Sequence, residues 1–187
     1  NYHIIDDNFL KNHKEIKISI ANKYEYINID ENCKIYSSIK DEYDMMIIKL
    51  NKEQINHYLE IDENIYNDKS DTFYKNESIY LLHHPNDNVS VSFGYGIEKI
   101  NEYKIKHKCT TEFGSSGGPI LSLKTNKIIG FHRAFVQKKS KLGIQNQNED
   151  DNFNIGTFLK FPLNELNKKG AVNKINEIKL KIKIDKN

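Results

Sequence analysis

The stretch Glu112–Ile120, EFGSSGGPI, gathers three of the nine glycines and one of the three prolines of a 187-residue chain around two serines. Glycine admits backbone conformations with positive φ and has no Cβ to block a neighbouring molecule. The plainest interpretation of such a cluster is a Gly/Ser turn before a strand. The same features also suit a nucleophilic serine, which needs an exposed hydroxyl and backbone N–H groups aimed at one point.

The stretch also fits the G-x-S-x-G pattern of the α/β-hydrolase elbow, through Gly114, Ser116 and Gly118. That elbow requires a helix directly after the serine, followed along the chain by an Asp and then a His. Here Pro119 follows within three residues, and the run 120–123, ILSL, is typical of a strand. We therefore reject the hydrolase elbow. A triad in the order His, Asp, Ser remains to be considered.

Short β-prone runs separated by turn signals dominate the rest of the chain. Strands at this spacing, without strong helical periods between them, favour an antiparallel sandwich or barrel. The predicted strands cover 16–20, 23–28, 45–50, 78–83, 89–97, 103–109, 119–123, 127–136 and 154–161.

One helix is predicted late in the chain, because Pro162 suits a first helical turn and Gly170 suits a helix end. The polar segment 138–152 predicts a long surface loop, and a composition dip around 61–75 suits a linker between two halves. Residues 178–184 alternate apolar and basic side chains, which fits a strand with one solvated face.

Upstream of Ser116, Asp44 opens the apolar run MMII and could become the desolvated partner of a histidine, although strand-start turns also favour Asp. Two histidines precede it. His3 is followed by two isoleucines, whereas His13 lies in the polar run KNHK. The residues alone leave both histidines open as the base.

Three segments together resemble the chymotrypsin-fold, or trypsin-like, serine proteases. GSSGGP (114–119) resembles the segment of their active serine, DMMIIKL (44–50) their aspartate segment, and NYHII (1–5) the histidine segment of bacterial-type members. The stretch 78–135 resembles the glutamyl endopeptidase branch along its length, and the resemblance covers residues 1–169.

The resemblance implies an all-β fold of two antiparallel six-stranded Greek-key barrels with a short C-terminal helix. Residues 1–68 would form the first barrel, incomplete at its N-terminal end, because the family has several strands before its histidine. Residues 69–170 would form the second barrel and the helix, and residues 171–187 a lysine-rich extension.

The resemblance also implies a serine endopeptidase that acts through a Ser/His/Asp triad and an acyl-enzyme. Ser116 would be the nucleophile, His3 the general base and Asp44 the residue that orients the imidazole. The N–H groups of Gly114 and Ser116 would form the oxyanion hole. Ser115 departs from the Asp that is common before the active serine, which argues against activation by a newly cut N-terminal amine.

Substrate preference follows from the same resemblance. Thr110 stands where a preference for Lys or Arg requires Asp. Thr111 and His132 would line the substrate pocket, where a hydroxyl and an imidazole suit a carboxylate or a carboxamide. This predicts cleavage after Glu, or after Gln. Arg133 and Ala134 would offer their backbone to the substrate as an added strand.

The composition argues against several other classes of function. The charge is nearly balanced, 28 Lys and Arg against 26 Asp and Glu, so neither nucleic acid nor a membrane is an expected partner. Cys33 and Cys109 form no CxxC pair, which argues against a disulfide framework or a cysteine metal site and favours a reducing, cytoplasmic compartment. His83 and His84 are adjacent on a strand and point to opposite faces, so they do not share an ion.

No cofactor and no metal are implied, and the expected partner is a peptide or protein substrate. The sequence leaves the oligomeric state open. The main alternative is a protease-like binding module without turnover, which the position of His3 at the start of this chain favours. A nucleic-acid binder that uses the basic C-terminal residues is a third alternative.

Overall fold

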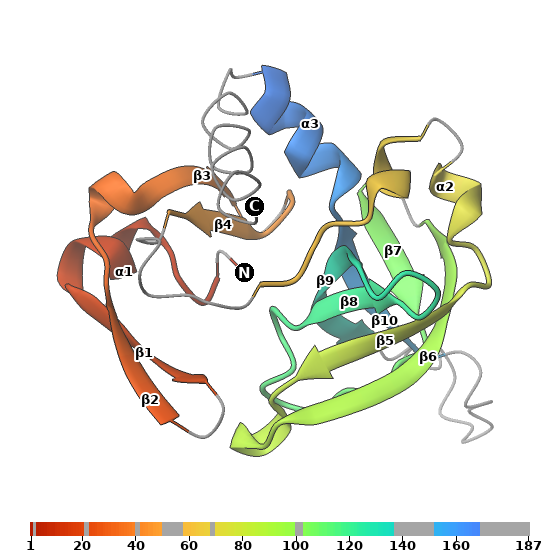
Figure 1. Ribbon diagram of the computed structural model, residues 1–187, viewed down its shortest axis with the longest axis horizontal. Helices are drawn as coiled ribbons and strands as arrows, with labels where there is room; N and C mark the ends of the chain where they lie inside the picture. Colours follow the sequence, from red (N-terminus) through yellow and green to blue (C-terminus); the bar gives the residue numbers. More distant parts are fainter. Residues whose placement is uncertain are drawn as a thin grey trace, which may run out of the picture. The chain divides into compact units, whose positions relative to one another are not determined.

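Figure 1 shows the computed structural model, which describes residues 1, 3–20, 23–39, 42–49, 58–67, 70–99, 103–136 and 152–168. The chain divides into two compact units. Unit 1 comprises Asn1 and Leu59–Lys160, and unit 2 comprises Tyr2–Tyr58 and Phe161–Asn187. Each unit is described by itself.

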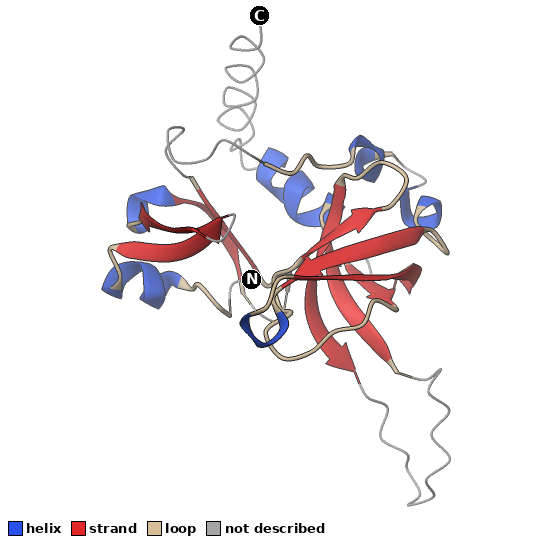
Figure 2. Cartoon of the chain, turned by 60° about the horizontal axis from the view of Figure 1, so that its bottom comes forward, coloured by secondary structure: helices blue, strands red, loops and turns tan. Residues whose placement is uncertain are grey.

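Unit 1 contains a closed barrel of six antiparallel strands, which are among the strands drawn in red in Figure 2. β5, β6 and β7 follow one another as a meander, whereas β8 returns to pair with β5, and β10 closes the barrel between β7 and β9. Closure leaves no continuous open sheet edge. The strands are β5 (Ser78–His83), β6 (Ser90–Lys99), β7 (Lys104–His107), β8 (Pro119–Ser122), β9 (Ile128–Val136) and β10 (Phe153–Phe158).

The barrel core follows from the period-2 pattern of its strands. In β5 every second residue is buried, which puts Ile79, Leu81 and His83 inside. Burial of each large apolar side chain contributes about 1.5–3 kcal/mol to folding. The fully buried apolar side chains of unit 1 are Ile65, Ile79, Leu81, Ile120, Leu121, Ile129, Phe158 and Leu159.

Strand β6 differs from a usual barrel strand, because its small residues face inward and its large apolar residues face outward. Its half-buried positions carry Ser90, Ser92, Gly94 and Gly96, whereas Val91, Phe93 and Tyr95 are exposed. A Cβ on Gly94 would lie 2.5 Å from the backbone nitrogen of Cys109, and one on Gly96 would lie 2.7 Å from the carbonyl oxygen of Tyr74. The close approach of the neighbouring backbone therefore requires glycine at both inner positions.

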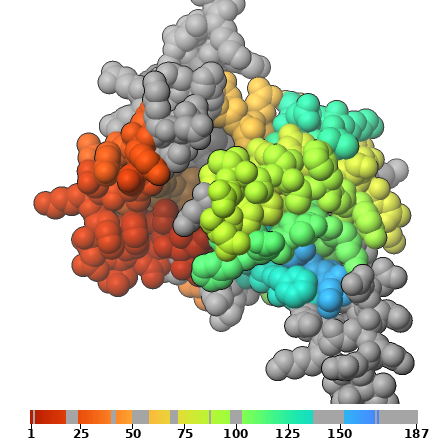
Figure 3. Space-filling view, turned by 90° about the horizontal axis from the view of Figure 1, so that it is seen from below, coloured from red at the N-terminus to blue at the C-terminus, as the bar shows by residue number. Residues whose placement is uncertain are grey.

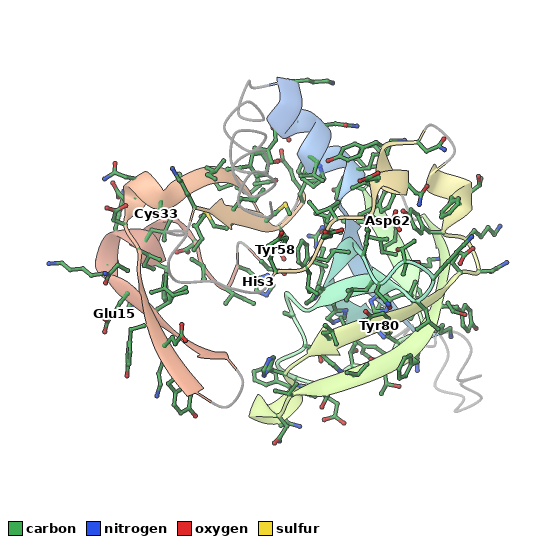
Figure 4. The ribbon with its side chains drawn as sticks, viewed as in Figure 1. His3, Glu15, Cys33, Tyr58, Asp62 and Tyr80 are labelled. Atoms are coloured by element: carbon green, nitrogen blue, oxygen red, sulfur yellow. The ribbon has the colours of Figure 1, made fainter. Side chains whose placement is uncertain are left out.

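Three short helical turns complete unit 1: η3 (Glu63–Tyr66), α2 (Ser70–Phe73) and η4 (Pro85–Asp87). The fully buried Asp62, labelled in Figure 4, caps η3 by accepting from the backbone N–H of Asn64 at 2.9 Å. Its second carboxylate oxygen accepts from the Thr125 hydroxyl at 2.8 Å. These bonds tie the entry into unit 1 to the β8–β9 turn.

Unit 2 contains two two-stranded antiparallel sheets in its described residues. β1 (Glu15–Ile20) pairs with β2 (Lys23–Asn28), and β3 (Lys34–Ser38) pairs with β4 (Met45–Ile48). Helix α1 (Asp7–Asn12) precedes them and is capped by Asp6, whose carboxylate accepts from the N–H of Phe9 at 2.7 Å. A small core holds this unit together: Leu10, Ile27 and Ile29 are buried, with Ile5, Phe9, Ile16, Met46 and Ile48 packed against them.

Helix α3 (Lys160–Lys168) starts where unit 1 ends, two residues before the predicted start at Pro162. A turn of η1 (Glu31–Cys33) leads into β3. In unit 2 the Tyr36 hydroxyl of β3 donates to the carboxylate of Glu165 on α3 at 2.9 Å. This bond links the first part of unit 2 to its last described part.

The prediction of an all-β fold of antiparallel barrels with a short C-terminal helix is confirmed for the closed six-stranded second barrel and for α3. Where the first, incomplete barrel was predicted, the described residues of unit 2 form two separate two-stranded sheets. Strand β3 and helix α1 were not predicted, because β3 ends in two serines and α1 is only six residues long. The predicted loop 138–152 and the extension 171–187 lie outside the described residues, apart from Asn152. Within the described ranges, no helix is long and apolar enough to cross a membrane.

Candidate functional site

The stretch from Thr111 to Gly118, here called the serine loop, is anchored to β9 by backbone hydrogen bonds. The N–H of Gly117 donates to the carbonyl of His132 at 2.9 Å, and the N–H of His132 donates to the carbonyl of Gly118 at 2.8 Å. The positive φ of 85° at Gly117 is a conformation that favours glycine. The glycines therefore serve to fold the loop back onto the barrel.

Ser115 holds the serine loop from the inside. Its side chain is buried, and its hydroxyl accepts from the N–H of Glu112 at 3.0 Å and pairs with Nδ1 of His83 at 2.8 Å. Burial, and next the charge of His84, lower the pKa of His83, so the imidazole is neutral at physiological pH. The position that is commonly Asp in the family resembled by the sequence is a structural hydroxyl here.

Ser116 is half-buried, and its hydroxyl donates to the carbonyl of Arg133 at 3.2 Å. Arg133 is the extra residue of a β-bulge, because Ala134 pairs with Ile155 and His132 pairs with the next residue of β10. A bulge leaves its extra residue outside the regular ladder and re-aims its groups. The bulge thus brings the Arg133 carbonyl to the hydroxyl of Ser116.

Several N–H groups of the serine loop have no backbone acceptor among the described residues, and the two predicted oxyanion donors are among them. Among the residues that the structure describes, neither the N–H of Gly114 nor that of Ser116 donates to another backbone group. Gly114 has a φ of 90°, and a Cβ there would lie 2.7 Å from the carbonyl oxygen of His84. Both groups, predicted as oxyanion donors, therefore lie in the same short turn, where they have no backbone acceptor among the described residues.

Thr111 joins a buried polar chain that the sequence did not predict. Its hydroxyl donates to Oδ1 of Asn154 at 2.6 Å, and Nδ2 of Asn154 donates to the carbonyl of Cys109 at 2.7 Å. Asn154 is buried on β10 and pairs across the sheet with His107. The carboxamide of Asn154 therefore fixes the start of the serine loop to the barrel wall.

His132 also belongs to this buried cluster. Its Nδ1 lies 3.2 Å from Nε2 of His107, and both imidazoles are buried. Burial lowers the pKa of His107 to about 3 and that of His132 to about 4, so both rings are neutral at physiological pH. Nδ1 of His107 has no hydrogen-bond partner among the described residues.

The other two predicted site residues form a pair in unit 2. Nδ1 of His3 lies 2.6 Å from Oδ2 of Asp44, and Oδ1 of Asp44 accepts from the backbone N–H of His3 at 3.0 Å. The Asp44 side chain is 2% exposed, against 29% for His3, which Figure 4 labels. Asp44 has a φ of 52°, which places it in a tight turn directly before β4. One carboxylate thus fixes both the backbone and the ring of His3.

The structure therefore groups the predicted site residues in two sets. Gly114, Ser116, Thr111, His132, Arg133 and Ala134 belong to unit 1, and His3 and Asp44 belong to unit 2. Sequence reasoning missed Asn154 and gave no role to His83 and His107. The signal that could have found them is their position on inward-facing strand residues, where a polar side chain needs a buried partner.

The two cysteines lie outside the serine loop. Burial raises the pKa of the Cys109 thiol to about 12, which makes it a poor nucleophile. Cys33 is half-buried in unit 2, and Figure 4 shows it away from His3. In the described part of the chain, no three His, Cys, Asp or Glu side chains are arranged to hold a metal ion.

Comparison with known proteins gives one family match. The model of Peptidase family C4 matches residues 83–164, which is less than half of the chain. No curated protein matches.

Several solved structures are similar to the chain. A catalytically active tobacco etch virus protease complexed with product is 18% identical, with 81% of this chain and 59% of that chain covered and a TM-score of 0.46. A catalytically inactive tobacco etch virus protease complexed with substrate is 16% identical, with 81% and 64% covered and a TM-score of 0.48. Tobacco vein mottling virus protease is 17% identical, with 60% and 46% covered and a TM-score of 0.37. The chain thus spans less than two thirds of the length of each.

The family match corrects the class predicted from the sequence. Family C4 comprises cysteine endopeptidases, so the prediction of a Ser/His/Asp serine endopeptidase of the glutamyl endopeptidase branch, with its preference for Glu, is wrong. The motif around position 116 was interpreted as a loop that would present a nucleophile and oxyanion donors. Because that geometry is needed whichever atom attacks, it does not separate serine from cysteine branches. The matched segment is similar to a peptidase family, and the barrel is consistent with a chymotrypsin-like fold.

Proposed function

We propose that the chain is an endopeptidase domain of the C4 kind, which binds a peptide segment and cleaves it at a carbonyl presented to position 116. The observation that carries this proposal is the contact of 2.6 Å between His3 and the buried Asp44. A carboxylate that accepts from Nδ1–H leaves Nε2 of the imidazole as an acceptor, which is the state required of a general base. The match of residues 83–164 to Peptidase family C4 supports the same reaction class.

Position 116 is the nucleophile position in this proposal, and it carries a hydroxyl in this chain. A cysteine peptidase attacks with a thiolate, which forms at neutral pH far more readily than an alkoxide. We expect turnover to rise when a thiol, the nucleophile of a cysteine peptidase, is placed at position 116.

The N–H groups of Gly114 and Ser116 are the proposed oxyanion donors. Both belong to a loop that is anchored to β9, so they would stabilise a developing charge without first reorganising. Removal of one such donor typically costs roughly 10²–10³ in turnover.

The proposed substrate-binding residues are Thr111, His132, Arg133 and Ala134. Strand β8 pairs with β9 only as far as Phe131, so Ala134 has a strand neighbour on the β10 side alone in the described part of the barrel. An extended peptide could pair with the open side of β9 through its backbone. Thr111 and His132 would line the substrate pocket with uncharged side chains, since the pKa of His132 is about 4.

A mixed peptide library analysed by mass spectrometry tests the proposal with three forms of the chain. Wild type should release defined products slowly, Ser116→Cys should release the same products faster, and Ser116→Ala should release none. Absence of cleavage by folded wild type and folded Ser116→Cys would refute the proposal. Equal cleavage by Ser116→Ala would show that position 116 is not the nucleophile position.

A further inference from the structure

Phe113 is the most exposed large apolar side chain of the described residues, with 91% of its surface accessible. It belongs to the serine loop, directly before Gly114 and three residues before Ser116. Solitary exposed apolar residues are common on protein surfaces and need no explanation by themselves. The position of this one, beside the proposed oxyanion donors, makes it a candidate for contact with a substrate.

The backbone that carries Phe113 is fixed on both sides. The carbonyl of Phe113 accepts from the N–H of Asn86 at 3.1 Å, and Nδ2 of Asn86 donates to the carboxylate of Glu112 at 2.8 Å. On the other side Gly114 passes so close to the carbonyl of His84 that no side chain fits. The loop therefore presents the ring to solvent from a backbone that is held in place.

We propose that Phe113 is a specificity-determining residue that packs against an apolar side chain on the leaving-group side of the substrate. The inference rests on the proposed function. In the proposed function the acyl side of the peptide is assigned to β9, Thr111 and His132. Phe113 is the one large apolar side chain of the serine loop and is left for the leaving-group side. A rigid aromatic ring gives a large contact area at low cost in side-chain entropy, which suits selection of Leu, Ile, Phe or Tyr.

The test compares cleavage patterns of the full chain with a proteome-derived peptide library. New N-termini released by wild type should be enriched at least threefold in Leu, Ile, Phe or Tyr at the first or second position. Phe113→Ser should lose that enrichment while the residues before the cleaved bond stay the same, and Phe113→Leu should retain most of it. Because 91% of the Phe113 surface is exposed, both variants should fold as wild type does.

Phe93→Ser is the matched control, because Phe93 is also exposed, at 66%, but lies on the outer face of β6. In Figure 3 the yellow-green segment that includes β6 covers much of the barrel face in view. Cleavage without apolar enrichment, or enrichment that survives Phe113→Ser, would overturn the inference while leaving the proposed function intact. An enrichment lost equally in Phe93→Ser would also overturn it. A library that no form of the chain cleaves would instead overturn the proposed function.

Discussion

The two units position their functional groups in different ways. In unit 1 a closed six-stranded barrel carries the serine loop, and hydrogen bonds from β5, β9 and β10 fix that loop at several points. In unit 2 the described strands form two separate pairs, and one carboxylate, Asp44, holds His3 through both of its oxygens. Isolated two-stranded sheets are marginally stable. In the described part of the chain, the loop that carries position 116 is thus held by hydrogen bonds from several strands, whereas His3 is held by one residue, Asp44.

Substitution of Asp44 is expected to have the largest effect on turnover. Asp44→Asn keeps the size of the side chain but removes the charge that fixes the Nδ1–H tautomer of His3, so turnover of the best library peptide should fall by on the order of 10⁴. The measurement is kcat in the Ser116→Cys form if that form is faster. Asp30→Asn is the control, since Asp30 is an exposed N-cap of unit 2 and Asn caps equally well. A fall in kcat of less than tenfold would mean that the Asp44 carboxylate does not control the proposed base, His3.

Acid should weaken the closed barrel of unit 1. The pKa values of His107 and His132 are about 3 and about 4 in the barrel, below the value of about 6.5 expected in the unfolded chain. Below pH 6.5 the unfolded state therefore binds more protons than the folded barrel does. The contribution of the two imidazoles to the free energy of unfolding is fully present above pH 6.5 and declines as the pH falls toward 4. The decline should approach roughly 1.4 kcal/mol per pH unit for each imidazole.

Denaturant unfolding between pH 7.5 and 5, followed for unit 1, measures this decline. His107→Gln should reduce the slope, whereas His13→Gln should leave it unchanged because His13 lies exposed in unit 2. A barrel equally stable at both pH values would contradict the buried, neutral state assigned to the His107–His132 pair.

The inner face of β6 offers a smaller test of the barrel. Gly94→Ala would place a methyl group 2.5 Å from the backbone of Cys109 and should destabilise unit 1 by about 1–3 kcal/mol. Ser92→Ala on the same strand is the matched control. The Ser92 hydroxyl is buried and unpaired among the described residues, so its removal should be neutral or stabilising. If thermal unfolding gave the same shift for both variants, the close approach at Gly94 would not be what constrains the strand.

The smallest expected effect lies in unit 2. Tyr36→Phe removes the hydroxyl that bonds Glu165 at 2.9 Å, and it should destabilise unit 2 by about 1 kcal/mol. Tyr24→Phe, on the exposed face of β2, should cost nothing measurable. Unfolding of unit 2 monitored by hydrogen exchange of β3 checks both, and equal protection in the two variants would show that the bond to α3 does not support this unit.

The sequence predicted the barrel well because its strands carry their own signals. The alternation of 78–83 and the glycines and proline of 112–120 are local patterns, and β5 and β8 lie where those patterns put them. The buried chain from Thr111 through Asn154 to Cys109 could not be predicted, because it depends on which strands become neighbours. The bulge at Arg133 is likewise a property of the β9–β10 pairing and leaves no mark in the sequence.

The peptidase class was mistaken for a related physical reason. A motif of glycines around position 116 reports how a loop turns, whereas the choice between hydroxyl and thiolate chemistry depends on the atoms that activate the nucleophile. His3 and Asp44 were named from spacing and resemblance, and their contact within unit 2 is a three-dimensional fact that spacing alone did not fix. That they act on position 116 of unit 1 is the central claim of the proposed function.

The rate of alkylation of a thiol at position 116, measured against pH, tests that claim most directly and needs no substrate. Ser116→Cys is treated with iodoacetamide, and peptide mapping separates the label on position 116 from label on Cys33 and Cys109. If His3 reaches the nucleophile position, the thiol should react with an apparent pKa well below its ordinary value of about 8.5, and His3→Ala should return that pKa to the ordinary range. An ordinary thiol pKa in Ser116→Cys that is unchanged by His3→Ala would contradict the proposal that His3 activates the nucleophile at position 116.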